Sequence, residues 1–359
     1  MNQQVQNNIQ TNTQANDQTN KQALVLGATG GIGGEVARLL MQRGWQVTTL
    51  HRNPDQVKDK TAAHIWIKGD VMVQGDVVQA AAGKSVIVHA VNPPGYRDWE
   101  KLVLPMIENT IAAAQASGAR ILLPGTVYNF GPDASPLIAE NASQFPITKK
   151  GKIRVEMEHR LRLAASKGVK SLIVRAGDFF GPKAANNWFS QGLVTPGKSV
   201  SVVRYPGSAG VGHQWAYLPD VAETMVRLLE RENELGNFAR FHMEGHWDHD
   251  GKQMVAAIGR VTAQPTLKAS WFPWPVFALL APFQQTLKEM MEMRYLWRTE
   301  VKMSNQALVD FLGEEPRTPL DVAVRSSLAG LSCIKRNASY ESGVPDARNF
   351  GITPNHDRA

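Results

Sequence analysis

The sequence of 359 residues predicts an α/β fold in which a doubly wound parallel sheet carries a smaller C-terminal lobe. Two observations predict this class. Five or more short apolar runs alternate with helical stretches between residues 22 and 182. A glycine-rich turn also joins the first apolar run to the first helical stretch, as in the first unit of a doubly wound sheet.

The elements follow one another in a regular order. The first strand holds Ala23 to Leu26, and Val36, Leu39 and Leu40 give the next stretch helical spacing before Gly44 ends it. Further strands are expected at 46–51, 64–70, 85–91, 120–125 and 171–182, and long helices at 102–118 and 151–168. Residues 213–218 read as a loop that leads into a helix from about Pro219. Alternation of this kind predicts a parallel sheet with helices on both faces.

The domain organisation follows from where this alternation stops. We expect a Rossmann domain over residues 21–240 and a smaller substrate lobe over 241–333, joined by parts of 183–215. Residues 1–20 and 334–359 are polar and lack periodicity, which predicts disordered tails.

Composition narrows the class of protein further. Hydrophobic residues make up 43% and charged residues 20%, which is ordinary for a globular chain. Cys333 is the single cysteine, so a disulfide framework is excluded within the chain, and with no signal peptide visible we expect a cytoplasmic protein. The net charge is +7, but the basic residues are scattered, which favours an anionic small ligand over nucleic acid.

One apolar run stands apart from the alternating pattern. Residues 271–283 read WFPWPVFALLAPF, and thirteen residues with three prolines are too short and too interrupted for a transmembrane segment. We expect this run to form a pocket wall or a subunit contact, as in a homodimer. An anchor on a membrane surface is the alternative.

The glycine turn predicts a binding site for a dinucleotide. Gly27, Gly30 and Gly33 allow, in that order, a tight turn, close approach to a pyrophosphate and close packing of helix on strand. The N-terminus of the following helix offers unpaired N–H groups to the phosphates. The residues expected to bind the cofactor here are Gly27, Thr29, Gly30, Gly31, Ile32 and Gly33. The alternative is that this glycine-rich turn only shapes the backbone and binds no ligand.

The residues at the end of the second strand indicate whether NAD(H) or NADP(H) is the preferred cofactor. NAD sites place an acidic residue there, but this chain has Arg52 and no carboxylate before Asp55. An arginine attracts a 2′-phosphate, so we expect NADP(H) to be preferred over NAD(H), unless Arg52 only points into solvent. Asp70 and Val71, at the end of the third strand, are expected to meet the adenine.

Several ordered segments resemble the extended or atypical short-chain dehydrogenases/reductases, of the epimerase/dehydratase and NmrA-like branches. The resemblance covers residues 22–330. It rests on GATGGIG at 27–33, VRAGDFFGP at 174–182, WAYLPDVA at 215–222 and SNQALVDFLGEEPRTPLDVAV at 304–324. It implies a Rossmann fold, a nicotinamide cofactor and a small-molecule substrate.

In this family a tyrosine and a lysine stand four residues apart on the helix after the fifth strand. The resemblance places Lys152 on the lysine that binds the nicotinamide ribose and Thr148 on the tyrosine that carries the proton. No tyrosine occurs between Asn129 and Arg204, so a shifted alignment does not restore one. Lys152 has a simpler reading, because Glu156 one turn later suits a surface ion pair. Thr126 and Tyr128 are the remaining candidates for polar catalytic partners.

Other candidates come from loops at the carboxyl edge of the sheet. Ala90, Val91 and Asn92 follow the fourth strand, where they are expected to contact the cofactor. An apolar substrate pocket is expected from Tyr96, Phe179, Phe180, Trp188 and Trp215. The histidines of FHMEGHWDHD at 241–250 are interrupted by Gly245, so no metal site is expected.

Three functions remain open at this point. An NADP(H)-dependent oxidoreductase acting on a small, fairly apolar carbonyl, enone or alcohol is the first. An NADP(H)-binding sensor or regulatory protein without turnover is the second, and the missing tyrosine favours it. A sugar-nucleotide epimerase or dehydratase is the third, and it depends most on the missing proton carrier.

Overall fold

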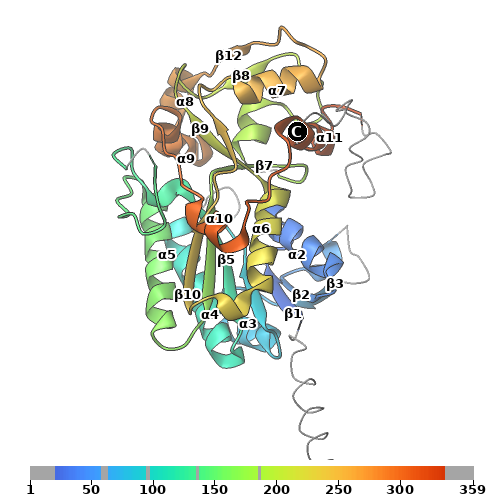
Figure 1. Ribbon diagram of the computed structural model, residues 1–359, viewed down its shortest axis with the longest axis vertical. Helices are drawn as coiled ribbons and strands as arrows, with labels where there is room; N and C mark the ends of the chain where they lie inside the picture. The colour runs from blue at the N-terminus through green and yellow to red at the C-terminus, as the bar shows by residue number, and fades with distance from the viewer. Residues whose placement is uncertain (1–20, 58–63, 94–97, 135–136, 185–186, 336–359) are drawn as a thin grey trace, which may run out of the picture.

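The computed structural model describes residues 21–57, 64–93, 98–134, 137–184 and 187–335. Seven parallel strands form the central sheet in the order β10-β6-β5-β4-β1-β2-β3 (Figure 1). Their bounds are β1 Gln22–Leu26, β2 Gln46–His51, β3 His64–Lys68, β4 Val86–His89, β5 Arg120–Thr126, β6 Ser171–Ala176 and β10 Phe238–His242. The strand order reverses between β1 and β4, so the predicted doubly wound Rossmann sheet is confirmed.

Helices cover both faces of this sheet, as the alternating sequence predicts. On one face lie α2 Gly31–Gln42 and α6 Leu218–Glu230, joined by α10 Gln306–Leu312. On the other lie α3 Gln74–Ala81, α4 Trp99–Ser117 and α5 Lys149–Ala165. The strands β1, β4, β5 and β6 are almost fully buried, because each side of the sheet packs against aliphatic side chains of these helices, whereas the edge strands β3 and β10 are partly exposed.

The smaller lobe lies beyond the carboxyl edge of the sheet (Figure 1). It has two small sheets, β11-β9-β7 and β12-β8. Its strands are β7 Asp178–Phe180, β8 Val203–Tyr205, β9 His213–Tyr217, β11 His246–Asp248 and β12 Ala269–Trp271. Its helices are α7 Gln253–Val261, α8 Trp274–Leu280, α9 Gln285–Glu292 and α11 Leu320–Gly330.

An aromatic core holds the smaller lobe together. Trp215 and Trp297 are almost fully buried, with ring centroids 5.7 Å apart, and Phe180 and Phe189 pack beside them. One sequence prediction fails here, because residues 213–217 form β9 and not a loop. Every residue of β9 is buried, so it lacks the polar alternation by which a half-exposed strand is recognised. The predicted domain boundaries stay a prediction, and the two predicted tails lie outside the described residues.

Candidate functional site

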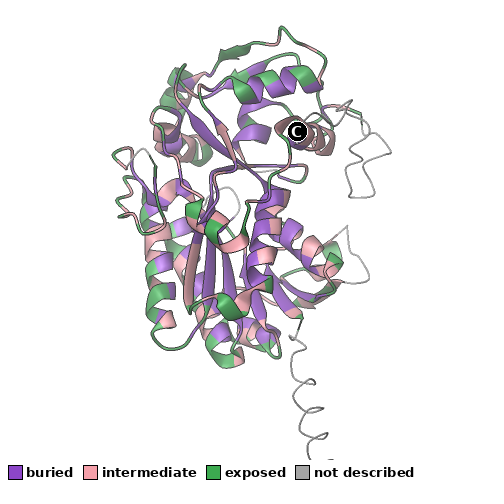
Figure 2. Cartoon of the chain, in the orientation of Figure 1, coloured by how far each residue is buried: buried purple, intermediate pink, exposed green. Residues whose placement is uncertain are grey.

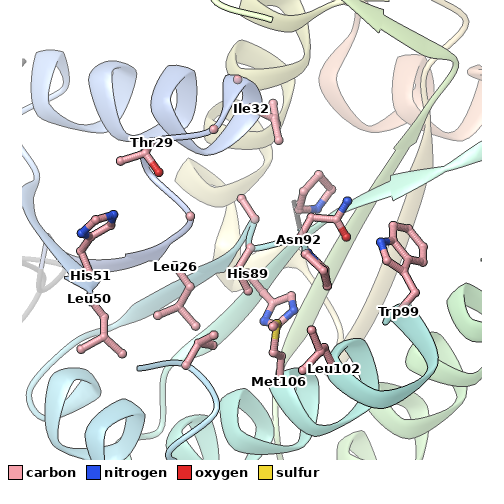
Figure 3. Close-up of a pocket in the computed structure, with 18 of the residues that line it drawn as sticks. Leu26, Thr29, Ile32, Leu50, His51, His89, Asn92, Trp99, Leu102 and Met106 are labelled. Atoms are coloured by element: carbon pink, nitrogen blue, oxygen red, sulfur yellow. The ribbon is translucent and has the colours of Figure 1, made fainter. Parts of the chain in front are cut away.

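A cavity of about 560 Å³ runs along the carboxyl ends of β1, β2, β3, β4 and β5. Figure 3 shows Leu50 and His51 at one end, Thr29 beside the glycine turn, and Asn92 and Trp99 at the other end. This is the edge at which the strand order reverses, where open α/β sheets bind their ligands. The dimensions and position suit an extended dinucleotide.

The glycine turn after β1 has the geometry that the motif predicts. Gly27 has a φ of +92°, and a Cβ there would lie 2.6 Å from the carbonyl oxygen of Ala90. A Cβ on Gly33 would lie 2.3 Å from the carbonyl oxygen of Gly27, so this glycine lets α2 pack closely on β1. Gly33 does not line the cavity itself, whereas Gly27, Thr29, Gly30, Gly31 and Ile32 do. No side chain caps the N-terminus of α2, which begins at Gly31.

The end of the cavity beside β2 and β3 contains three residues that the sequence analysis assigned to cofactor binding. Arg52, Asp70 and Val71 all line it. Arg52 is exposed after β2, so its guanidinium is available to an anion at the cavity mouth. Asp70 accepts a hydrogen bond from the amide of Met72 at 3.0 Å, which fixes the turn after β3.

At the opposite end, polar groups come from the ends of β4 and β5. Ala90, Val91 and Asn92 line the cavity, as do Thr126 and Tyr128. Tyr128 lies on the short helix η3 Val127–Asn129. The Oγ1 of Thr126 is buried and has no hydrogen-bond partner among the described residues. A buried hydroxyl without a partner is costly, which makes Thr126 a candidate for a hydrogen bond to a ligand.

Helix α5 does not present Lys152 to this cavity. Lys152 is exposed and is not among the lining residues, whereas Arg154 lines the cavity. Two residues correspond to a turn of about 200° around a helix, so the two side chains face opposite sides. The guanidinium carbon of Arg154 lies 5.3 Å from the ring centroid of Trp99. The predicted placement of Lys152 is therefore corrected, and the cation of α5 at the cavity is Arg154.

One turn before Arg154, the same face of α5 carries Lys150. Its ammonium lies 2.8 Å from a carboxylate oxygen of Glu289 on α9, and burial lowers the pKa of Lys150. Lys150 thus joins α5 to the smaller lobe. Thr148 has a different part, since it is the N-cap of α5 and accepts a hydrogen bond from the amide of Gly151 at 2.9 Å.

Gly151 explains how the start of α5 sets the position of Tyr128. A Cβ at Gly151 would lie 2.3 Å from the carbonyl oxygen of Tyr128, so α5 and η3 touch backbone to backbone. The Thr148 cap holds Gly151 in the first turn of α5. These two residues of the segment TKKGK therefore support Tyr128 from outside the cavity.

His89, the last residue of β4, also lines the cavity. Its Nδ1 lies 2.8 Å from Thr110 Oγ1, and that hydroxyl donates to the carbonyl of Met106. The imidazole therefore donates from Nδ1 and is neutral. Burial, with a smaller contribution from the charge of Arg154, lowers the pKa of His89 to about 3.

Apolar side chains complete this end of the cavity. Figure 3 shows Trp99, Leu102 and Met106 of α4 on this side. Pro124 and Phe179 also line the cavity. Sequence reasoning missed the residues of α4, because an inward helix face has the same apolar spacing whether it meets a core or a cavity.

The predicted aromatic pocket is only partly present. Phe179 lines the cavity. Phe180, Trp188 and Trp215 instead lie in the core of the smaller lobe, where they pack on other aromatic rings. Tyr96 lies outside the described residues.

Metal-binding groups and membrane-spanning helices are both absent from the described part of the chain. Within the described ranges, no three His, Cys, Asp or Glu side chains are grouped so that they could hold a metal ion. In the same part of the chain, no helix combines the length and the apolar character that crossing a membrane requires.

Comparison with known proteins finds a family model that matches part of the chain. Residues 27–193 match the model of the NAD(P)H-binding family. This part of the chain is therefore similar to NAD(P)H-binding domains, and it includes the glycine turn. No curated protein has a sequence that matches this chain.

Solved structures share the fold at low sequence identity. MoeE5 in complex with UDP-glucuronic acid and NAD has 16% identity and a TM-score of 0.65, over 86% of this chain and 98% of that one. A putative epimerase from Burkholderia cenocepacia has 18% identity and a TM-score of 0.65, over 87% and 98%. UDP-glucose 4-epimerase from Thermotoga maritima has 14% identity and a TM-score of 0.65, over 86% and 98%. The chain thus has the fold of epimerase/dehydratase-type short-chain enzymes, which agrees with the sequence resemblance.

Proposed function

We propose that the protein is an NADP(H)-dependent oxidoreductase of the atypical short-chain type, acting on a small, fairly apolar carbonyl, enone or alcohol. The observation that carries the proposal is the hydroxyl of Thr126, which is buried in the cavity wall and has no partner among the described residues. It lies two residues from Tyr128, at the end of the cavity where Arg154 and Trp99 also meet. A substrate oxygen placed there would receive the hydrogen bond that no described residue accepts.

The residues present fit a nicotinamide dinucleotide along the whole cavity. Gly27 and Gly30 leave room for a pyrophosphate, Arg52 faces the adenosine end, and Arg154 would bind the nicotinamide ribose. Such a cofactor, when bound, supplies or accepts a hydride. Its 2′-phosphate would gain a charge-assisted hydrogen bond from Arg52, worth about 1.5–3 kcal/mol or roughly 10- to 150-fold in affinity.

In this proposal the protein's own groups hold the substrate and move its proton. Thr126 orients the substrate oxygen, and the phenol of Tyr128 exchanges the proton in place of the missing helix tyrosine. Trp99, Leu102, Met106 and Phe179 exclude water from that end, which favours an apolar substrate. A positioned acid or base of this kind contributes about 10²–10⁴-fold to a rate.

A sugar-nucleotide substrate fits this cavity less well. Arg52 and Arg154 are the cationic residues among the described lining residues, and the cofactor would engage both. The smaller lobe contributes Phe179, Ala184 and Asn187 to the described lining, and none of them neutralises a second diphosphate. Two sugar-nucleotide structures share the fold, but the lining favours a smaller, less charged substrate.

Cofactor titration and turnover together test the proposal. NADPH should bind at least about tenfold more tightly than NADH by fluorescence, and Arg52→Ala should remove that preference. NADPH should then be consumed with a member of a panel of aldehydes, enones and quinones. Tyr128→Phe should lower kcat by about 100-fold or more while the Kd for NADPH stays unchanged.

Each alternative gives a different result in the same experiment. Tight NADPH binding without consumption by any substrate would favour the sensor protein, whose case rests on the missing helix tyrosine. Tighter binding of NADH than of NADPH would contradict the part assigned to Arg52. Interconversion of a UDP-sugar without net change in NADPH would instead support the epimerase.

A further inference from the structure

The outer face of helix α8 is apolar and exposed. Val276, Leu279, Leu280 and Phe283 follow one another at spacings of three, one and three residues, so they share one side of the helix and the turn after it. They are 48%, 72%, 43% and 85% exposed. We refer to these four residues as the α8 outer face.

The inner side of the same helix is apolar too. Trp274 is buried, and its ring centroid lies 4.8 Å from that of Phe272 and 5.9 Å from that of Trp188. Phe277 packs on Phe272 at 5.0 Å. A helix that is apolar all round is normally buried on all sides, yet α8 is covered on one side only. The core of the smaller lobe is thus complete without the α8 outer face, which leaves that face for an external partner.

The position of α8 suits contact with a large, flat partner. The helix lies at the outer edge of the smaller lobe, away from the Rossmann sheet (Figure 1). Figure 2 shows exposed residues along α8 and along β12 before it. Trp271, on β12, is itself 66% exposed. Large, contiguous exposed apolar patches mark interaction sites on proteins that otherwise bury such residues.

Along the sequence, the charged residues nearest the α8 outer face are basic. No Asp or Glu occurs between Asp250 and Glu289. Lys268 and Lys288 flank the apolar stretch, are exposed, and form no ion pair with any residue that the structure describes. Arg204 is exposed on β8, next to Ser270 of β12. An apolar face with a basic border repels a second copy of itself and attracts an anionic surface.

We propose that the α8 outer face docks the protein on the surface of an anionic phospholipid bilayer. Phe283, Leu279 and their neighbours would insert into the boundary between headgroups and acyl chains, and Trp271 would lie at the level of the headgroups. Lys268, Lys288 and Arg204 would meet the lipid phosphates. Three prolines among residues 271–283 keep the segment short, so it lies on the bilayer and does not cross it. This inference is independent of the proposed reaction.

Sedimentation with vesicles tests the docking. The full-length protein should bind vesicles of phosphatidylcholine that contain about one third phosphatidylglycerol, and should bind pure phosphatidylcholine more weakly. Added salt should weaken the binding. The double variant Leu279→Ser/Phe283→Ser should lower the partition coefficient by at least roughly tenfold, since burial of each large apolar side chain is worth about that factor. Leu163→Ser is the matched control, because Leu163 is 53% exposed on α5 and should not matter.

A site-specific probe locates the contact. Cys333 is buried, so an environment-sensitive fluorophore attached to the variant Phe283→Cys should report on residue 283. Its emission should shift to the blue with the anionic vesicles, and the same fluorophore on Leu163→Cys should not respond. The proposal is overturned if the wild-type protein fails to sediment with the vesicles, or if the double variant binds them as well as the wild type. A wild-type dimer that the double variant turns into a monomer, without vesicle binding, would make this face a self-association surface and overturn the proposal as well.

Discussion

Arg154 and Lys152 are two residues apart on α5, and they differ in what their cationic groups can reach. Arg154 lines the cavity beside Trp99, whereas Lys152 is exposed on the other side of the helix. The sequence shows that no tyrosine occurs between Asn129 and Arg204. The sequence does not show which cationic side chain of the helix faces the cavity. The segment TKKGKIR has four cations within seven residues, and only the packing of the helix decides which of them faces inward.

Replacing each cation in turn tests this assignment. Arg154→Ala should raise the Kd for NADPH by roughly 10- to 150-fold, because a charge-assisted hydrogen bond to the ribose would be lost. Lys152→Ala is the matched control and should leave that Kd within about twofold. Isothermal titration measures both, with thermal unfolding as a check that each variant is folded. If only Lys152→Ala binds NADPH more weakly, then Lys152 binds the nicotinamide ribose, as the sequence resemblance implies, and Arg154 does not.

The contact between α5 and α9 is a feature of the elements and not of single residues. Lys150 and Glu289 form a buried ion pair across it, with side chains 4% and 15% exposed, and Lys150 also donates to the carbonyl of Glu289. The pair holds the start of the helix that carries Arg154. It thereby fixes the smaller lobe against the Rossmann domain beside the cavity.

Breaking this pair on one side should cost more than removing it altogether. Lys150→Met leaves Glu289 without its cation and should lower the free energy of unfolding by about 3–5 kcal/mol. The double variant Lys150→Met/Glu289→Gln should recover most of that loss, because no uncompensated charge then remains. Urea unfolding of the wild type and the single and double variants completes the cycle. Additive effects of the two substitutions would mean that the pair is not coupled as the geometry indicates.

Sequence patterns predicted the elements of the Rossmann domain better than those of the smaller lobe. Each strand of the main sheet except β10 was expected, since apolar runs between helices are a strong signal. The strand expected at 171–182 was too long, because β6 ends at Ala176 and residues 178–180 form β7 of another sheet. Strand β9 was missed because it is buried throughout. The cavity residues of α4 were missed because Trp99 and Met106 have the spacing of any inward helix face. The turn, Arg52 and Asp70 were found because parallel strands bring their carboxyl ends together.

At the scale of the whole molecule, buried neutral histidines join distant parts of the chain. His242 on β10 accepts from Arg175 at its Nε2, 2.7 Å away, and donates from Nδ1 to the carbonyl of Ile138. Arg175 in turn is held by Glu158 of α5. Burial, aided by the charge of Arg175, lowers the pKa of His242 to about 3, the same value as for His89. Burial also lowers the pKa of His246 to about 4.

From these histidines we expect the free energy of unfolding to decrease as the pH falls. Each of these histidines has a pKa of about 3 to 4 in the folded chain and of 6.5 in the unfolded chain. Between these two values the unfolded chain binds a proton at each histidine and the folded chain does not. The free energy of unfolding therefore decreases as the pH falls. Asp220 acts in the opposite direction between 3.8 and about 6, because burial raises its pKa and the folded state binds the proton. Each histidine costs about 2 kcal/mol between pH 7 and pH 5, and Asp220 returns about 1 kcal/mol. The net loss from these four groups is about 4–5 kcal/mol.

Urea unfolding at about pH 7, 6 and 5 measures this slope. The variant His242→Gln keeps an acceptor for Arg175 and a donor for Ile138 but cannot take up a proton, so its stability should depend on pH less steeply than that of the wild type. The difference should be about 1 kcal/mol for each pH unit below 6. His159→Gln is the control, because His159 is exposed on α5 and should leave the slope unchanged. If the free energy of unfolding of His242→Gln falls with pH as steeply as that of the wild type, then His242 does not cause the acid sensitivity. Other groups in the fold must then cause it.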